Sequence, residues 1–468
     1  MKNLLALSAI FIILFLLSGV AIGQNIQSER RIEEAKRKAL EKTELKILEG
    51  ESRLVFDYGG WINFRYDNSD DDDNNSSLVD ILDYTLSLDF RYWIKATLRP
   101  PAGASYPNRH SFYLRLKDLY IERHPLDINQ ENYDQDGPHI DYAYLVLDFR
   151  PCWLEIGRRY FGVGQGISYS NVHDGMELLF SPRDWNIKTF VSHTLPHEDN
   201  IDTSVPGWEG GSDRVFYGLE GTYLGISGHG IYGYLLVQRD YSDEEPEDPV
   251  HDYTYDSQYY GLGFQGKINP KTHYWAEIIN ETGESHVYAT GEKKDVHAWA
   301  GDFGISYDWD VYSHPNLSIE YAFGSGDPDR TSVTDTQGGN TTKDDRNFLY
   351  FGYLPSGYAL SPRLSNIHLY KLGILLKPFE KYHFFRNLTL GIDYYRYYKF
   401  KSGGGIYDAE ATIGNDDIGN ELDLDISWQI SSDISFSLQY GYFQPHEAYP
   451  DLSDDSEQYL SISTTLTF

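Results

Sequence analysis

The side chains that could carry out catalysis do not form a recognisable catalytic pattern in this sequence. Histidines and serines lie close together in one region, at His173, His193, His197, Ser168, Ser170 and Ser192. No spacing among them matches a nucleophile placed beside a general base. The sequence also has no glycine-rich phosphate loop, zinc-type histidine spacing or Gly-x-Ser-x-Gly turn. We therefore expect a protein that is not an enzyme and that needs no cofactor.

The run from Asp70 to Asp73 is a candidate metal-binding segment. Carboxylate oxygens suit Ca²⁺, and such a run could also bridge divalent cations to lipopolysaccharide. The run lacks the glycine-spaced loop of a built calcium site, so a solvated loop is the favoured interpretation. His193 and His197 are likewise expected to be solvated, and no metal site is predicted.

Charged residues recur at every second position of segments whose other positions are apolar. Within residues 83–98, Arg91 and Lys95 alternate with Phe90 and Tyr92. This alternation is typical of strands that have one face in lipid and the other in water. The predicted water-facing residues are basic in the first third of the chain and acidic in its last half. The candidate pore-lining residues are Arg91, Lys95, Arg115, Lys117, Glu155, Arg159, Lys371, Asp302, Glu320, Asp393, Asp423 and Asp425.

Two interpretations of the inward basic residues stay open. A ladder of guanidinium groups would attract carboxylates by bidentate pairing. Alternatively, each Arg pairs with a carboxylate on a neighbouring strand and stiffens the wall. Arg158 faces lipid by strict alternation, and a bulge at Gly157 is the feature that could turn it inward.

Residues 52–468 are predicted to form an all-β fold, a single transmembrane antiparallel β-barrel. The alternation and turn residues indicate about 18 strands. Short links such as Asn269-Pro270 alternate with long links such as residues 327–364, as periplasmic turns alternate with extracellular loops. Links 99–109 and 124–138 are both moderately long, which leaves a count of about 16 strands as the alternative. Link 327–364 is long enough that we expect it to fold over the mouth or into the lumen and to narrow the pore.

Composition alone does not distinguish this barrel from a secreted all-β enzyme or lectin. Aromatic residues make up 15% of the chain, and the mean hydropathy is -0.50. The final strand supplies the distinction, because apolar residues dominate every second position from Tyr459 to the terminal Phe468. A terminal aromatic residue on such a strand looks like the assembly signal of bacterial outer-membrane barrels. The outer-membrane assembly machinery is therefore an expected partner.

The N-terminal region is predicted to have two parts. Residues 1–23 have the positive start, the short apolar core and the small-residue cleavage site of a signal peptide. Residues 24–51 are rich in alternating charges and strong helix formers, which indicates a helical charged periplasmic segment. Cys152 is the one cysteine of the chain, so no internal disulfide is possible. The net charge of -32 lies mostly between strands and excludes a nucleic acid held by a general basic field.

Two regions resemble the alginate export family of outer-membrane barrels over roughly residues 52–468. The first contains Tyr142 to Phe149, Gly157-Arg158-Arg159 and Asp174-Gly175. The second contains Gly324-Ser325-Gly326-Asp327, Leu354-Pro355-Ser356-Gly357 and Asn366. The resemblance implies a barrel that passes an anionic polysaccharide, with basic side chains at the constriction. Arg159 stands where the family usually has Gln.

These features predict an integral protein of the bacterial outer membrane that works as a passive channel for an anionic polysaccharide or a related carbohydrate. The alternative is a diffusion porin for small solutes or ions, and an outer-membrane enzyme is ranked last. Expected partners are outer-membrane lipids, lipopolysaccharide and the carbohydrate or small-solute cargo. If the basic first third lines the constriction, anions should be favoured despite the net negative charge, because the charges in the loops are screened by salt.

Overall fold

The computed structural model describes residues 53–70, 82–99, 109–125, 133–196, 198, 201, 211–242, 254–287, 292–334 and 343–468. The predicted signal peptide, residues 1–23, and the predicted helical segment, residues 24–51, lie outside these residues. In the part of the chain that is described, no helix is long and apolar enough to cross a membrane.

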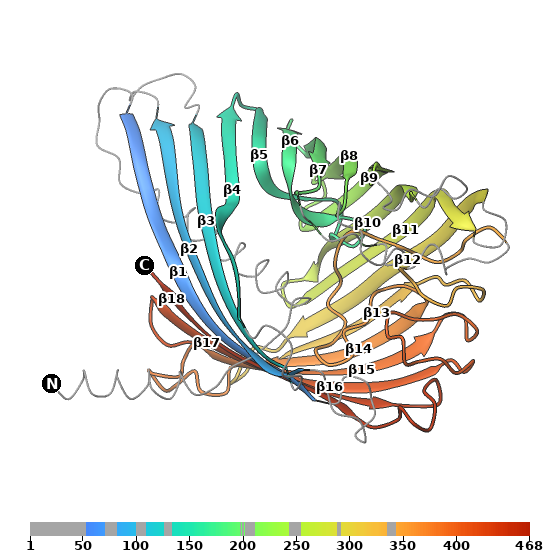
Figure 1. Ribbon diagram of the computed structural model, residues 1–468. Helices are drawn as coiled ribbons and strands as arrows, with labels where there is room; N and C mark the ends of the chain where they lie inside the picture. The colour runs from blue at the N-terminus through green and yellow to red at the C-terminus, as the bar shows by residue number, and fades with distance from the viewer. Residues whose placement is uncertain are drawn as a thin grey trace.

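The described chain forms 18 antiparallel strands in a single sheet, which curves into a continuous wall from β1 to β18 (Figure 1). The first nine strands are β1 (Arg53–Asp70), β2 (Leu82–Arg99), β3 (His110–Pro125), β4 (Tyr133–Asp148), β5 (Cys152–Gly162), β6 (Ser170–Phe180), β7 (Trp185–His193), β8 (Arg214–Tyr223) and β9 (His229–Asp240). The remaining strands are β10 (Asp256–Asn269), β11 (Thr272–Val287), β12 (Glu292–Asp308), β13 (Asn316–Gly324), β14 (Ile367–Leu376), β15 (Leu388–Lys399), β16 (Asp417–Gln429), β17 (Ile434–Pro445) and β18 (Glu457–Thr467). Links 99–109 and 124–138, which left 16 strands as the alternative, each lie between two distinct strands, β2 and β3 and then β3 and β4. The predicted count of 18 is therefore confirmed.

The sheet closes because β1 pairs with β2 on one side and with β18 on the other. Just beyond the last residue of β18, the main chain of Phe468 exchanges two hydrogen bonds with Gly60, of 2.9 and 3.0 Å. Closure leaves no edge strand with unpaired N–H and C=O groups, which is the condition for a sheet to sit in hydrocarbon.

The two faces of the wall differ in the way that the alternation predicts. In β2, Tyr92 is 47% exposed on the outer face, whereas its neighbour Arg91 is only 3% exposed on the inner face. The exposed large apolar residues of the other strands follow the same parity, for example Ile278 in β11 and Leu422 in β16. The outer face therefore places apolar side chains against the lipid, and the charged residues lie inside.

The interior is partly filled by connections that fold inward. Buried apolar residues from the β13–β14 connection, including Phe348, Leu349 and Leu360, pack with inner-face residues such as Tyr259 and Tyr397. The main buried cluster therefore lies inside the barrel, against strands such as β10 and β15, which carry Tyr259 and Tyr397.

Candidate functional site

Arg91 of β2 and Arg115 of β3 are held by carboxylates on the inner wall. Arg91 lies 2.8 Å from Asp89 and 3.1 Å from Asp141. Arg115 pairs with the same Asp141 carboxylate. Both guanidinium groups lie over the Trp61 ring, at 5.6 and 5.2 Å from its centre. Arg115 thus pairs with the neighbouring strand β4, whereas Arg91 pairs with Asp89 of its own strand and reaches across β3 to Asp141.

Three further predicted basic positions lie on the same inner arc. Lys117 pairs with Asp136 at 3.0 Å. Arg159 lies 3.1 Å from Glu155 on its own strand and 2.8 Å from Glu177 of β6. Lys95 differs from these residues, because it makes no ion pair or hydrogen bond with a side chain of any described residue, although Asp57 stands opposite it in the β1–β2 register.

The predicted acidic residues other than Glu155 lie together on a different arc, from β12 to β16. Lys371 of β14 pairs with Asp393 of β15 at 3.0 Å, and Glu320 of β13 stands opposite Lys371. Asp423 stands opposite Asp393 in the β15–β16 register. The remaining two residues of the set are Asp302, which is buried on β12, and Asp425, which accepts a 3.0 Å hydrogen bond from Ser427. The inner face thus has one arc, from β2 to β6, where basic residues pair with carboxylates, and a second arc, from β12 to β16, where acidic residues outnumber Lys371.

The prediction that a bulge at Gly157 could turn Arg158 inward is wrong. Arg158 pairs with Asp174 through two 2.9 Å hydrogen bonds, on the same outer face as the exposed Met176. Gly157 has a φ of +126°, and a Cβ there would meet the carbonyl oxygen of Ala143 at 2.1 Å. The glycine permits close approach of β4 and β5, while the alternation continues past it.

The β13–β14 connection folds into the barrel, which confirms the predicted insertion for its described residues. The carboxylate of Glu421 on β16 accepts hydrogen bonds from three successive main-chain N–H groups, those of Tyr358 (2.6 Å), Ala359 (2.7 Å) and Leu360 (3.2 Å). The hydroxyl of Tyr397 donates to the same carboxylate at 2.9 Å. Gly357 has a φ of +123°, and a Cβ there would lie 2.6 Å from this carboxylate, so the turn requires glycine.

Glu281 of β11 holds a second point of the same connection. It accepts hydrogen bonds from the hydroxyls of Tyr255 (2.6 Å) and Tyr259 (3.0 Å) and from the main-chain N–H of Leu349 (3.0 Å). Burial, together with the charge of Glu281, raises the pKa of the Tyr255 phenol well above its ordinary value. Tyr255 therefore stays protonated and keeps donating to the carboxylate.

A shorter inward segment, residues 163–169, lies against the inserted connection. Its Gln165 N–H donates to Glu277 of β11 at 2.7 Å, and its Gly164 N–H donates to Glu220 of β8 at 2.9 Å. Main-chain hydrogen bonds from Phe351 to Ser168 (2.9 Å) and from Tyr353 to Gly166 (3.0 Å) join the two segments. The inward segments are thus fixed to each other as well as to the wall.

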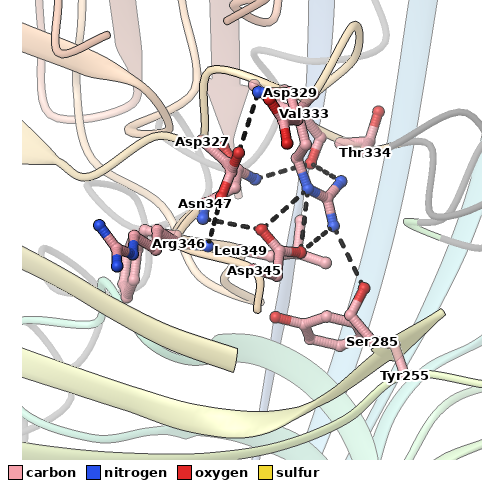
Figure 2. A network of polar contacts seen from close by, with 12 residues as sticks. Tyr255, Ser285, Asp327, Asp329, Val333, Thr334, Asp345, Arg346, Asn347 and Leu349 are labelled. Carbon is pink, nitrogen blue, oxygen red and sulfur yellow. Dashed lines mark hydrogen bonds and ion pairs between the residues drawn. The ribbon is translucent and has the colours of Figure 1, made fainter. Parts of the chain in front are cut away.

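An ion pair within the connection stabilises its path. Arg330 and Asp345 are almost completely buried, and their closest atoms lie 2.6 Å apart. Figure 2 shows the network around Asp345, with Ser285 and Tyr255 of the wall on one side and Asp327 and Asn347 of the connection on the other. Ser285 is 3.5 Å from the Arg330 guanidinium, and Asp327 accepts from the main chain of Asp329 at 2.9 Å.

Among the residues that the structure describes, the histidine and serine candidates do not form a nucleophile–base pair. The Tyr169 hydroxyl lies between His173 (2.7 Å) and Ser192 (2.6 Å), and all three side chains are buried. His193 pairs with Asp213 at 2.7 Å. His197 and residues 71–73 lie outside the described residues.

A family model described as alginate export matches residues 50–463. The protein belongs to the alginate export family. Family membership and the closed barrel together make it an integral outer-membrane β-barrel porin. No curated protein sequence matches the chain.

Solved structures of outer-membrane proteins share the fold with this alginate export family member. OccAB4 of Acinetobacter baumannii has a TM-score of 0.57 at 14% identity, covering 89% of this chain and 99% of that one. OccAB1 of the same organism has a TM-score of 0.54 at 10% identity, covering 88% and 96%. OccK11 (OpdR) of Pseudomonas aeruginosa has a TM-score of 0.52 at 12% identity, covering 91% and 100%. At these identities the likeness concerns the fold alone.

The sequence reasoning missed the anchoring glutamates Glu220, Glu281 and Glu421. Their strands alternate as the others do, so nothing local distinguishes a carboxylate that binds a backbone from one that faces water. The sequence signal that could have indicated these anchors is the family motif in the connection. Its Ser356-Gly357 packs against Tyr397 and Glu421. Its Asn366 donates to the carbonyls of Gly404 (3.0 Å) and Gly405 (2.9 Å).

Proposed function

We propose that this porin is a selective channel for carbohydrates that carry carboxylates. The observation that supports it best is Lys95, an inner-face cation without an ion-pair partner among the described residues, beside a row of aromatic rings. The other predicted cations of the basic arc are paired, so the proposal rests on this position and not on a continuous ladder of Arg.

The aromatic row crosses three adjacent strands on the inner face. Trp93 and Tyr113 stack with ring centres 6.0 Å apart, and Tyr113 and Tyr144 are 5.3 Å apart. All three rings are partly exposed, and Tyr113 stands opposite Lys95 in the β2–β3 register. The C–H groups of a pyranose ring pack on the electron-rich faces of such rings. A lysine ammonium supplies a point charge for the carboxylate of an acidic sugar.

The alternative is a diffusion porin for small solutes. It is favoured by the ion pairs of Arg91, Arg115 and Arg159 and by the acidic arc, which together leave little excess positive charge on the wall. A porin of that kind would distinguish solutes by size and sign, and it would have no preference for an acidic sugar over an equally charged small anion.

Planar-bilayer recordings of Lys95→Gln test the proposal. An acidic oligosaccharide should block the native channel more strongly than a neutral one of equal length. Loss of one charge-assisted contact should weaken that block by about tenfold. Lys95→Arg should retain the block, and Lys117→Gln, which removes a cation already paired with Asp136, is the matched control.

Equal block by the acidic and the neutral oligosaccharide, unchanged in Lys95→Gln, would contradict the proposal and leave the diffusion porin.

A further inference from the structure

The outer surface of the barrel has a cleft of about 360 Å³ at the rim where the long connections lie. Its lining combines apolar and basic side chains and comprises Ile278, His297, Trp299, Phe323, Ser325, Gly326, Arg346, Phe400 and Lys401. The volume lies within the range of roughly 300–1,000 Å³ that is usual for small-molecule sites.

The alternation of β12 places this cleft on the lipid-facing side. His297 and Trp299 are exposed, whereas Val296, Ala298 and Ala300 between and beside them are completely buried inside. Ile278 on the neighbouring β11 is exposed on the same outer face. The floor of the cleft is therefore part of the surface that contacts lipid.

The inserted connection brings a cation to this surface. β13 ends at Gly324, so the upper edge of β12 pairs instead with the connection. The N–H of His297 donates to the carbonyl of Asp345 at 2.8 Å, and the N–H of Asp345 donates to that of Asp295 at 2.9 Å. Asp345 and Asn347 are buried, so Arg346 between them points outward and is exposed. Figure 2 shows the Arg346 side chain extending away from the network around Asp345.

A second cation, Lys401, also lines the cleft. Lys401 follows β15, and its ammonium lies 5.4 Å from the centre of the Phe400 ring. Phe400 stacks on Phe323 with ring centres 6.2 Å apart, which forms an aromatic wall. Neither the Arg346 guanidinium nor the Lys401 ammonium has an ion pair in the described chain. The Asp327 carboxylate accepts instead from the main-chain N–H of Arg346, at 3.2 Å.

We propose that this cleft binds a phosphorylated glycolipid of the outer leaflet, with its phosphate between Arg346 and Lys401 and an acyl chain along Ile278, Trp299 and Phe323. The charge argues for this occupant, because two cations without an ion pair among the described residues stand out on a chain with a net charge of -32. Their position argues for it too, because the long connections mark the extracellular rim, and the apolar floor continues into the hydrocarbon. Arginine and lysine both bind phosphate, Arg as a bidentate fork and Lys as a point charge.

Binding of diphosphoryl lipid A to the full-length protein in detergent micelles, followed by native mass spectrometry, tests this assignment. Arg346→Gln combined with Lys401→Gln should weaken binding by at least about tenfold, since two charge-assisted contacts are lost. Arg346→Lys alone should retain binding. Lys377→Gln combined with Arg386→Gln removes the same two residue types from the β14–β15 turn at the opposite rim and should change nothing. Heat-modifiable migration on gels verifies that each variant is folded.

Two other probes separate the possible sources of the phosphate. Dephosphorylated lipid A should bind the native protein about as weakly as diphosphoryl lipid A binds the double variant. Inorganic phosphate, which has no chain to fill the apolar floor, should bind far more weakly than the glycolipid. Equal affinity for the phosphorylated and dephosphorylated lipids, or an affinity for inorganic phosphate equal to that for diphosphoryl lipid A, would overturn the proposal.

Discussion

At the scale of single residues, the presence of a charged side chain on the inner face does not show that it is available to a solute in the lumen. Glu281 and Glu421 lie on the inner wall, yet their carboxylates are occupied by main-chain N–H groups and tyrosine hydroxyls of the inward segments. Arg91 and Arg115 share one aspartate in the same way. The hydrogen-bonding oxygens of these groups therefore fix the shape of the interior.

Glu421→Ala should release part of the inserted connection. The substitution leaves the N–H groups of Tyr358, Ala359 and Leu360 without their acceptor, at roughly 1–3 kcal/mol for each buried group that stays unpaired. The connection should then detach from β16, with higher single-channel conductance and faster cleavage by added protease within residues 343–366.

Asp425→Ala is the control for this variant, because Asp425 lies four residues further along β16 on the same face and accepts from Ser427 of its own strand. Equal conductance and equal cleavage in the two variants would show that Glu421 does not hold the connection in place.

At the scale of elements, the β13–β14 connection is the part of the chain that departs most from a simple barrel. It forms bridges with the 163–169 segment at one point and with β12 at another, through Tyr169–Phe351 and Val296–Asp345. Its buried Arg330–Asp345 pair joins two points of the connection that are 15 residues apart. Removing one member of such a pair is costly, because the other is left as an uncompensated buried charge.

Deleting residues 330–345 should raise the conductance, because the deletion removes both members of this pair together with the bridge to β12. Single-channel recording of the deletion variant beside the native protein measures the effect, with heat-modifiable migration as the evidence of a folded barrel. A folded variant with unchanged conductance would mean that the connection rests on the wall without restricting the passage.

At the scale of the whole molecule, the barrel depends on one closing seam. β1 must pair with β18, at the two ends of a folded region of about four hundred residues, and such distant contacts form late because loop closure is costly. The terminal Phe468 extends this seam through its main chain, while its side chain is 65% exposed on the outside.

Deleting Phe468 should reduce assembly into the outer membrane, measured as the fraction of protein that shows heat-modifiable migration in membrane extracts. Phe468→Ala is the informative comparison, because it keeps the two main-chain hydrogen bonds to Gly60 and removes only the ring. If both variants lose assembly, the ring is needed as a recognition signal. If only the deletion reduces assembly, the main-chain hydrogen bonds of the seam are needed and the aromatic ring is not. Normal assembly of both would contradict a role for this residue.

The sequence by itself predicted the barrel, a count of about 18 strands with 16 as the alternative, and the alternation of its inner and outer faces, because a lipid-facing strand must alternate with period two. It also indicated that the long connection folds inward. Only the tertiary structure decided which charges remain unpaired. Arg91 and Lys95 look equivalent in the sequence, but Asp141, fifty residues from Arg91 in the chain, pairs with it, whereas no described residue pairs with Lys95. The outward direction of Arg346 likewise follows from the pairing of its segment with β12, a long-range contact that local alternation does not contain.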